Sequence, residues 1–292
     1  MRFAPLLLGV VVVACGRQDA RSVASYEVPI EAAPTEAPAP RPEAPCAADI
    51  VLGPGLEHER RAIAATKSPT SDTPCLDIVR ADLATYRLRV LSSSRDGNGS
   101  HPAPWWRDTF HLVAVTNAGM FHEGGDPVGL VVEDGATLGH DNKKFSGYLA
   151  FDDAGNATIA GRDCPGFDLA KLRTQYRSVV QSGRLLGCNG EALPWKDKKQ
   201  YSAAAIGLSR DRKQVVFLHA RDAVTMTELA TAVAELDLSG AIFLEGGPEA
   251  SLVVRGAKSE LSRVGSYETG FVENNENQSF WWLPNVIALE TK

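Results

Sequence analysis

The chain has 292 residues, a formal net charge of −6 and 44% hydrophobic residues. This is an ordinary globular composition, and the length allows a sizeable core within one main domain. The mild acidity and the lack of a basic stretch with interleaved aromatic residues argue against nucleic acid as a partner.

The first 15 residues have the pattern of an export signal. Arg2 supplies positive charge, and the apolar stretch Phe3–Ala14 is too short to span a bilayer as a helix. The stretch runs into Ala-Cys-Gly, which resembles a bacterial lipobox, so we expect a lipoprotein signal peptide over residues 1–15 with lipidation at Cys15. The alternative is an ordinary secretory signal with a chance cysteine. Either way the protein is expected outside the cytoplasm, membrane-anchored only through lipid, and Gly16 favours the outer membrane in a Gram-negative cell.

Residues 16–45 are expected to be a tether, and residues 46–292 the folded domain. The segment Tyr26–Pro45 contains six prolines and four glutamates but few large apolar residues. Such a segment cannot bury enough surface to fold by itself and should be extended.

Four further cysteines remain in the exported part of the chain. An oxidising compartment favours disulfides, and four cysteines allow three pairings. Proximity in the sequence favours Cys46–Cys75 and Cys164–Cys188.

Short apolar runs separated by polar turns predict a chain rich in strands. We expect a hairpin within Leu76–Leu91 around a turn at Asp82–Thr85, and another that joins Tyr148–Phe151 to Ala157–Ala160. A third strand pair should join Ala203–Leu208 to Val215–His219.

One helix is predicted clearly, at about residues 225–237. Thr225 and Glu228 fit a capping box, and Leu229, Val233 and Leu236 recur at helical spacing. Together with the strands, this helix predicts an α+β fold, in which a twisted mixed or antiparallel sheet packs against one main helix and short helical turns.

Carboxylates near glycine turns are the main candidates for chemistry. The apolar run Ala241–Leu244 predicts a buried strand that ends at Glu245, and Gly246 and Gly247 leave room in front of that carboxylate. The alternative is a solvated glutamate at a turn. Glu249 lies near this turn, and Glu268 lies in a second glycine turn. Paired carboxylates suit glycosidic bond cleavage, and a cluster of oxygen ligands would also suit Ca²⁺ or Mg²⁺.

Several segments together resemble the phosphodiester glycosidase family. Thr116–Gly135 resembles its N-A/G-G-M/F-F … P-x-G-L motif, Gln181–Gly183 its Q-S-G segment, Ala241–Val254 its L-D-G-G-x-S segment, and Phe280–Leu289 its closing I-P-N-V segment. The family includes an animal enzyme that removes N-acetylglucosamine from a phosphodiester and leaves a phosphomonoester. The resemblance covers the chain from about Leu76 to the C-terminus, with the motifs in the same order.

This chain departs from the family pattern at four places. Glu245 replaces an aspartate, Pro248-Glu249 replaces a serine, and Arg184 replaces a proline. The family's Arg-Thr-Ala-x-Gly segment starts here with Ala203, so an arginine expected to bind phosphate is absent.

We therefore expect an exported hydrolase that cleaves sugar-1-phosphodiesters by carboxylate acid/base chemistry, with a carbohydrate phosphodiester as its partner and no cofactor or metal. The alternatives are a non-catalytic glycan-binding envelope lipoprotein on the same fold and a calcium-stabilised structural module. The expected catalytic residues are Glu245, Asn117, Glu249 and Glu268. The expected substrate-binding residues are Gly119, Gly246, Gly247, Arg221, Arg184 and Ser182.

Overall fold

The structure is a computed structural model that describes residue 46 and residues 49–65, 68–269 and 272–292. The expected signal peptide, the lipidation site Cys15 and the tether all lie outside the described residues. Those assignments therefore stay predictions.

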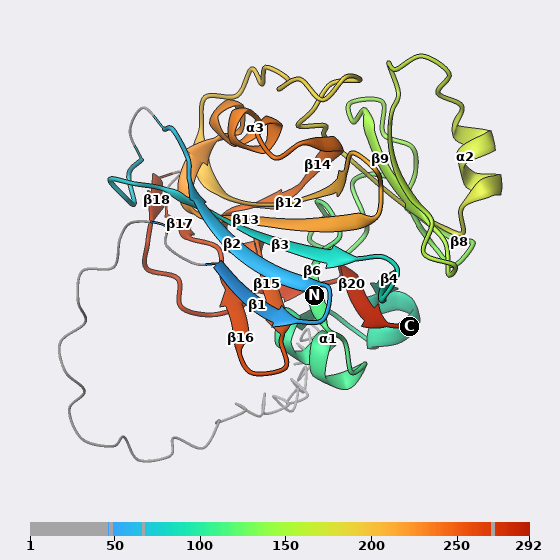
Figure 1. The fold of residues 1–292 in the computed structure, drawn as a ribbon, viewed down its shortest axis with the longest axis horizontal. Helices are drawn as coiled ribbons and strands as arrows, with labels where there is room; N and C mark the ends of the chain where they lie inside the picture. The colour runs from blue at the N-terminus through green and yellow to red at the C-terminus, as the bar shows by residue number, and fades with distance from the viewer. Residues whose placement is uncertain (1–45, 47–48, 66–67, 270–271) are drawn as a thin grey trace, which may run out of the picture. The chain divides into compact units, whose positions relative to one another are not determined.

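Three antiparallel sheets make up most of the fold (Figure 1). The first sheet has six strands, in the spatial order β1 (Asp49–Gly53), β2 (Leu56–Ala62), β3 (Cys75–Asp82), β13 (Gln214–Thr225), β12 (Gln200–Ser209) and β14 (Leu238–Gly246). The second sheet has five, in the order β10 (Ala157–Gly161), β9 (Gly147–Phe151), β11 (Ser178–Ser182), β7 (Val131–Glu133) and β8 (Ala136–Leu138).

The third sheet also has five strands, and two short ribbons complete the set. Its order is β16 (Glu260–Arg263), β15 (Leu252–Arg255), β6 (Ala114–Asn117), β20 (Asn285–Thr291) and β4 (Tyr86–Ser92). The ribbons pair β17 (Tyr267–Thr269) with β18 (Val272–Asn274), and β19 (Trp282–Leu283) with β5 (His101–Pro102).

The three sheets share one core. Val79 and Phe217 from the first sheet, Val180 from the second, and Val90 and Ile287 from the third belong to the same buried cluster. The first sheet is apolar on both faces, because its opposite face is covered by α3 (Met226–Ala234).

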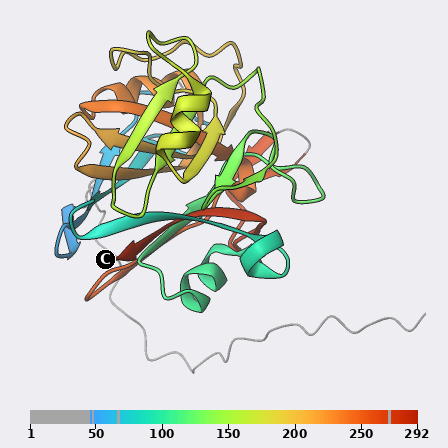
Figure 2. The ribbon, with the colours of Figure 1, turned by 90° about the vertical axis from the view of Figure 1, so that its right-hand side faces the viewer.

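The helices are short. The capping box of α3 is confirmed: the Glu228 backbone N–H donates to Thr225 Oγ1, and the Thr225 N–H donates to the Glu228 carboxylate. The helix ends at Ala234, before the expected residue 237, and Asp237 has a left-handed φ of 53°. Figure 2 shows α2 (Leu169–Gln175) on the second sheet, and α1 is Ala103–Thr109. Two single turns, Ser93–Gly97 and Gly247–Glu249, are also helical.

The predicted α+β class is wrong. The fold is mostly β, with 46% of the described residues in strands and 13% in helices. Every named strand pair among the described residues is antiparallel. Sheets pack mainly on sheets, and α3 covers one face of one sheet instead of forming a layer of its own.

Two of the three predicted strand pairs are confirmed. Phe151 pairs with Ala157 across β9 and β10, and Leu208 pairs with Val215 across β12 and β13. The hairpin predicted within Leu76–Leu91 is wrong. The turn exists, since the Thr85 N–H donates to the Asp82 carbonyl, but β3 pairs with β2 and β13 whereas β4 pairs with β20. Burial against distant strands outweighs the local pairing.

Both predicted disulfides are confirmed. Cys46 and Cys75 have Cα atoms 5.5 Å apart, and those of Cys164 and Cys188 are 5.6 Å apart. The first ties the start of the described domain to β3, and the second joins the loops that follow β10 and β11.

Candidate active site

Glu245 stands near the end of β14, directly after a β-bulge. Ala205 pairs with Phe243 and Ala204 with Glu245, so Leu244 is the extra residue. A bulge bends its strand and redirects the side chains beside it. The strand before Glu245 is buried, which fixes the backbone, while the Glu245 side chain is half-buried.

The electrostatic surroundings of Glu245 favour a neutral carboxyl. Burial raises its pKa to about 8; the Gly246 N–H, which donates to Oε1 at 3.0 Å, lowers the pKa, and the charge of Glu249 raises it further. Among the described residues, no basic side chain forms an ion pair with Glu245. Glu245 therefore holds its proton at neutral pH.

Asn117 ends β6 as a fully buried side chain. Its Oδ1 accepts from the Ser251 backbone N–H at 3.4 Å and from Thr116 Oγ1 at 3.3 Å. Its Nδ2 has no hydrogen-bond partner within the described part of the chain. Buried amide donors are nearly always satisfied, so this one is a candidate ligand donor. Because Ser251 lies six residues after Glu245, the bond to Asn117 also links the two strand ends.

Gly119 and Ser182 lie beside the strand ends that carry Asn117 and Glu245. Gly119 has a left-handed φ of 91°, and the Gln181 carbonyl oxygen is 3.7 Å from where a Cβ would stand. The Ser182 hydroxyl is buried and has no partner in the described residues. The Phe243 N–H donates to the Gly183 carbonyl at 2.8 Å, which places the end of β11 beside the end of β14. The structure thus brings Asn117, Gly119, Ser182 and Glu245 to adjoining strand ends.

The two glycines after Glu245 serve different needs. A Cβ on Gly246 would meet the Tyr201 ring at 2.5 Å. Gly247 has a left-handed φ of 68°, where a side chain would be strained. The Gly247 carbonyl accepts from Ser202 Oγ at 2.8 Å, so the turn is held from behind.

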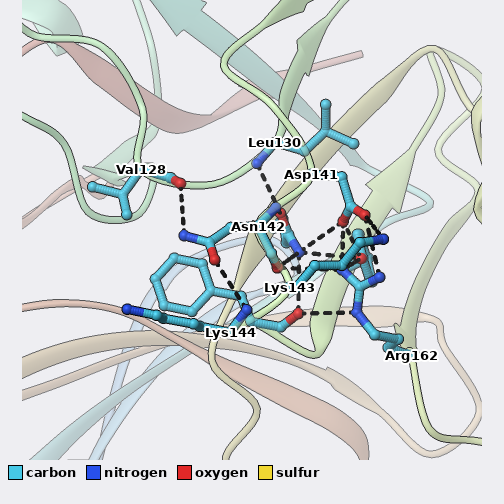
Figure 3. Close-up of polar contacts among 10 residues, drawn as sticks. Val128, Leu130, Asp141, Asn142, Lys143, Lys144 and Arg162 are labelled. Atoms are coloured by element: carbon cyan, nitrogen blue, oxygen red, sulfur yellow. Dashed lines mark hydrogen bonds and ion pairs between the residues drawn. The ribbon is translucent and has the colours of Figure 1, made fainter.

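Figure 3 shows a polar network that includes Asp141, Asn142 and Arg162, and the Gln181 side chain takes part in it. Gln181 Oε1 accepts from the Leu130 and Asn142 backbone N–H groups, both at 2.9 Å. Its Nε2 lies 3.0 Å from Asp141 Oδ1, and Asp141 pairs with Arg162. The network fixes the strand whose carbonyl approaches Gly119. A lone glutamine between valine and serine gives no local sign of such partners.

The structure gives Arg221 and Arg184 other partners. Arg221 Nη1 donates to the Val264 carbonyl at 2.9 Å, and Nη2 donates to the Asn277 carbonyl at 2.8 Å. Arg184 is buried, pairs with Asp163 and contacts both sulfurs of the Cys164–Cys188 disulfide. Both guanidinium groups brace the fold, and their predicted role in substrate binding is untested.

The two remaining predicted carboxylates, Glu249 and Glu268, lie on different elements. Glu249 ends the turn Gly247–Glu249 and lines an open hollow of about 540 Å³ together with Glu123 and four aromatic residues. Glu268 lies on β17, and its side chain is outside the described ones. Among the described residues, no group of three or more histidine, cysteine or acidic side chains is placed to hold a metal ion.

Asp77 on β3 joins His58 on β2 to Arg263 on β16, and His219 lies buried on β13. Asp77 Oδ1 lies 2.7 Å from His58 Nε2, and Arg263 Nε donates to Asp77 Oδ2 at 2.8 Å. His219 is fully buried, and burial lowers its pKa to about 4. Its Nε2 lies 3.1 Å from the Ala250 carbonyl. The imidazole is therefore neutral at pH 7 and holds the backbone between Glu249 and Ser251.

The sequence pattern of the phosphodiester glycosidase family matches residues 110–290, and the chain belongs to that family. No curated protein sequence matches the chain. Within the described residues, no helix is both long enough and apolar enough to cross a membrane.

Solved structures share the fold. One is the catalytic domain of zebrafish N-acetylglucosamine-1-phosphodiester alpha-N-acetylglucosaminidase, auto-inhibited by its pro-peptide, with a TM-score of 0.59 and 15% identity over 82% of this chain and 85% of that one. Another is a hypothetical protein from Synechocystis, with a TM-score of 0.63 and 13% identity over 86% of this chain and 65% of that one. At these identities the likeness is one of fold.

Proposed function

We propose that this protein is an exported hydrolase that cleaves the bond between a sugar and phosphate in a sugar-1-phosphodiester. Membership of the phosphodiester glycosidase family supports the reaction class. The observation that carries the proposal is Glu245, a carboxyl that keeps its proton at neutral pH, beside the second carboxyl of Glu249. A proton donor and a second carboxyl are what glycoside cleavage requires.

The two carboxyl groups divide the reaction between them. The bond between the anomeric carbon and the phosphate oxygen breaks, and Glu245 gives its proton to that departing oxygen, so phosphate leaves as a monoester. Glu249 either takes a proton from the attacking water or attacks the anomeric carbon itself, in which case water releases the sugar in a second step. In both cases one water is consumed and one free sugar is formed.

Asn117 and Ser182 hold the substrate in this proposal. The Asn117 Nδ2 donor and the Ser182 hydroxyl are buried and lack partners in the described residues. A bound sugar hydroxyl or phosphate oxygen would satisfy both, and satisfying a buried donor is worth about 1–3 kcal/mol. A bidentate arginine clamp on the phosphate is not part of this proposal, because Arg221 and Arg184 are bonded elsewhere.

The test is release of sugar from synthetic sugar-1-phosphodiesters by the purified full-length chain. We expect turnover by the wild type, its loss in Glu245→Gln and in Glu249→Gln, and its retention in Glu235→Gln. Glu235 is an exposed glutamate at the end of α3 and is a matched control for the same chemical change. Sugar binding without turnover in the wild type would favour the alternative, a non-catalytic glycan-binding lipoprotein.

The location is part of the same proposal. Two disulfides indicate folding in an oxidising compartment. We propose anchoring through lipid at Cys15, so Cys15→Ser should leave the protein soluble or unprocessed. If that variant still sediments with membranes after a high-salt wash, the lipoprotein assignment is wrong.

A further inference from the structure

Three segments that are far apart in the sequence meet at the hollow beside Glu249. Phe121 follows Asn117 by four residues, and Glu249 follows Glu245 by four. Trp281 and Trp282 precede β20, whose Asn285 carbonyl accepts from the Ala118 N–H at 3.0 Å. The hollow therefore adjoins the strand ends that carry the candidate active site.

The aromatic wall of the hollow is open to solvent and is backed by further stacked rings. Trp282 is 65% exposed and Trp281 39% exposed. The Trp282 ring stacks on His101 with centroids 5.9 Å apart, and His101 stacks on Trp105 at 3.5 Å. His101 Nε2 also lies 2.7 Å from the Gly97 carbonyl oxygen, so the stack is fixed from behind. A fixed, exposed aromatic surface is typical of a binding site.

The charges of the hollow select what fits it. Its charged side chains are Glu123 and Glu249, and no basic side chain is among its described lining residues. Two carboxylates repel a phosphate group but accept hydrogen bonds from hydroxyls. The apolar C–H face of a pyranose packs on an indole ring. A quaternary ammonium ion would also fit aromatic rings and carboxylates, so choline is one arm of the test.

We infer that this hollow is a subsite for an uncharged pyranose of the substrate, next to the bond that is cleaved. The inference rests on the proposed function, because it extends the substrate of that site from a single sugar phosphate to a longer glycan. The phosphate lies toward Asn117 and Ser182, and the neutral sugar lies on Trp281 and Trp282.

The experiment measures binding of neutral trisaccharides to the full-length chain. Chitotriose, cellotriose, maltotriose and mannotriose are titrated by calorimetry, with protection of tryptophan emission from acrylamide as a second readout. We expect at least one of them to bind and to protect. Trp282→Ala should weaken that binding about 3- to 10-fold, and Trp282→Phe should restore most of it because the ring is kept. Val51→Ala, which removes an apolar side chain that is 75% exposed on β1, should leave binding unchanged.

Other results would overturn the inference. These are no binding by any trisaccharide, equal binding by Trp282→Ala, or protection by choline chloride with none by the sugars. Glu123→Gln, a change in an exposed loop, gives a second test if Trp282→Ala does not fold, and it should also weaken binding. Because the readout is binding, the outcomes separate: protection without turnover refutes the proposed function alone, and turnover without protection refutes the subsite alone.

Discussion

Two acidic side chains of the first sheet have opposite electrostatic surroundings. Asp77 on β3 is 1% exposed, and burial by itself raises its pKa, but hydrogen bonds from His58 and Arg263 and the charge of Arg263 outweigh burial and hold the pKa well below its usual range. Glu245 on β14 has only the Gly246 N–H to oppose burial, and its pKa rises to about 8.

The difference separates a structural carboxylate from a chemical one. A buried carboxylate that is paired with cations stays ionised and serves as a fixed link between strands. A buried carboxyl without a cation keeps its proton, and a proton held near neutral pH can be transferred. Asp77 therefore holds Arg263 and β16 against the first sheet, and Glu245 is the group available for chemistry.

The largest expected effect comes from Glu245→Gln. Glutamine keeps the size and much of the hydrogen bonding but cannot give up a proton. Turnover of a sugar-1-phosphodiester should fall by ~10²–10⁴-fold, while the melting temperature at pH 7 should be no lower than that of the wild type, because glutamine has no charge to bury. Kinetics and thermal unfolding on the same preparation check this. A stable variant with full turnover would break the comparison, since Glu245 would then be as structural as Asp77.

Asp77→Asn should do the reverse. Removal of the Asp77 carboxylate leaves the Arg263 guanidinium without its charge partner, which costs about 3–5 kcal/mol of unfolding free energy. The folded fraction should keep its turnover per molecule. Urea denaturation with active-site titration tests this, and a loss of turnover with unchanged stability would contradict it.

Loss of the Cys164–Cys188 disulfide should lower stability without touching either carboxyl. Replacement of both cysteines by serine should reduce the unfolding free energy by about 2–4 kcal/mol, because the unfolded chain gains freedom. The pH dependence of turnover should keep its shape. Chemical denaturation and a pH–rate profile of the double variant test this, and a shifted profile would mean that Arg184, which contacts both sulfurs, acts on Glu245.

The two carboxyl groups should also differ in how stability depends on pH. The pKa of folded Glu245 is raised, so its contribution to stability is fully present below about 4.3 and is lost as the pH rises toward about 8. The pKa of folded Asp77 is lowered, so the contribution of Asp77 to stability is present above about pH 3.9 and is lost as the pH falls. The unfolding free energy of Glu245→Gln should therefore rise relative to that of the wild type between pH 5 and 8, by at most about 1.4 kcal/mol per pH unit. A parallel pair of curves would contradict this.

Local features of the fold could be predicted from the sequence because their causes are local. The turn at 152–156, the capping box of α3 and the pairing of the nearest cysteines all depend on residues close together in the chain. The class of the fold and the partners of β3 and β4 depend on strands far apart, so the sequence pattern misled. The helical spacing of α3 is a local pattern and does not show how the strands pair, so one helix does not determine the fold class.

The residues of the candidate site also fall into those predicted from local sequence and those that depend on distant segments. Glu245 and Asn117 were predicted because each follows an apolar strand and precedes glycine. The direction of the Arg221 and Arg184 side chains could not be predicted, since partners such as Cys164 and Asn277 come from loops 20 and 56 residues away. The hollow lined by Trp281, Trp282 and Glu249 needs three distant segments, and only its tandem tryptophans gave a sign in the sequence.

The most direct test of this account is the titration of Glu245 itself. Carbon-detected NMR of the side-chain carboxyl, assigned by comparison with Glu245→Gln, measures its pKa in the folded protein without any substrate. The account predicts a midpoint at about 8, with the carboxyl protonated at neutral pH. A midpoint near 4.3, the ordinary value for glutamate, would show an ionised group and contradict the assignment of Glu245 as the proton donor.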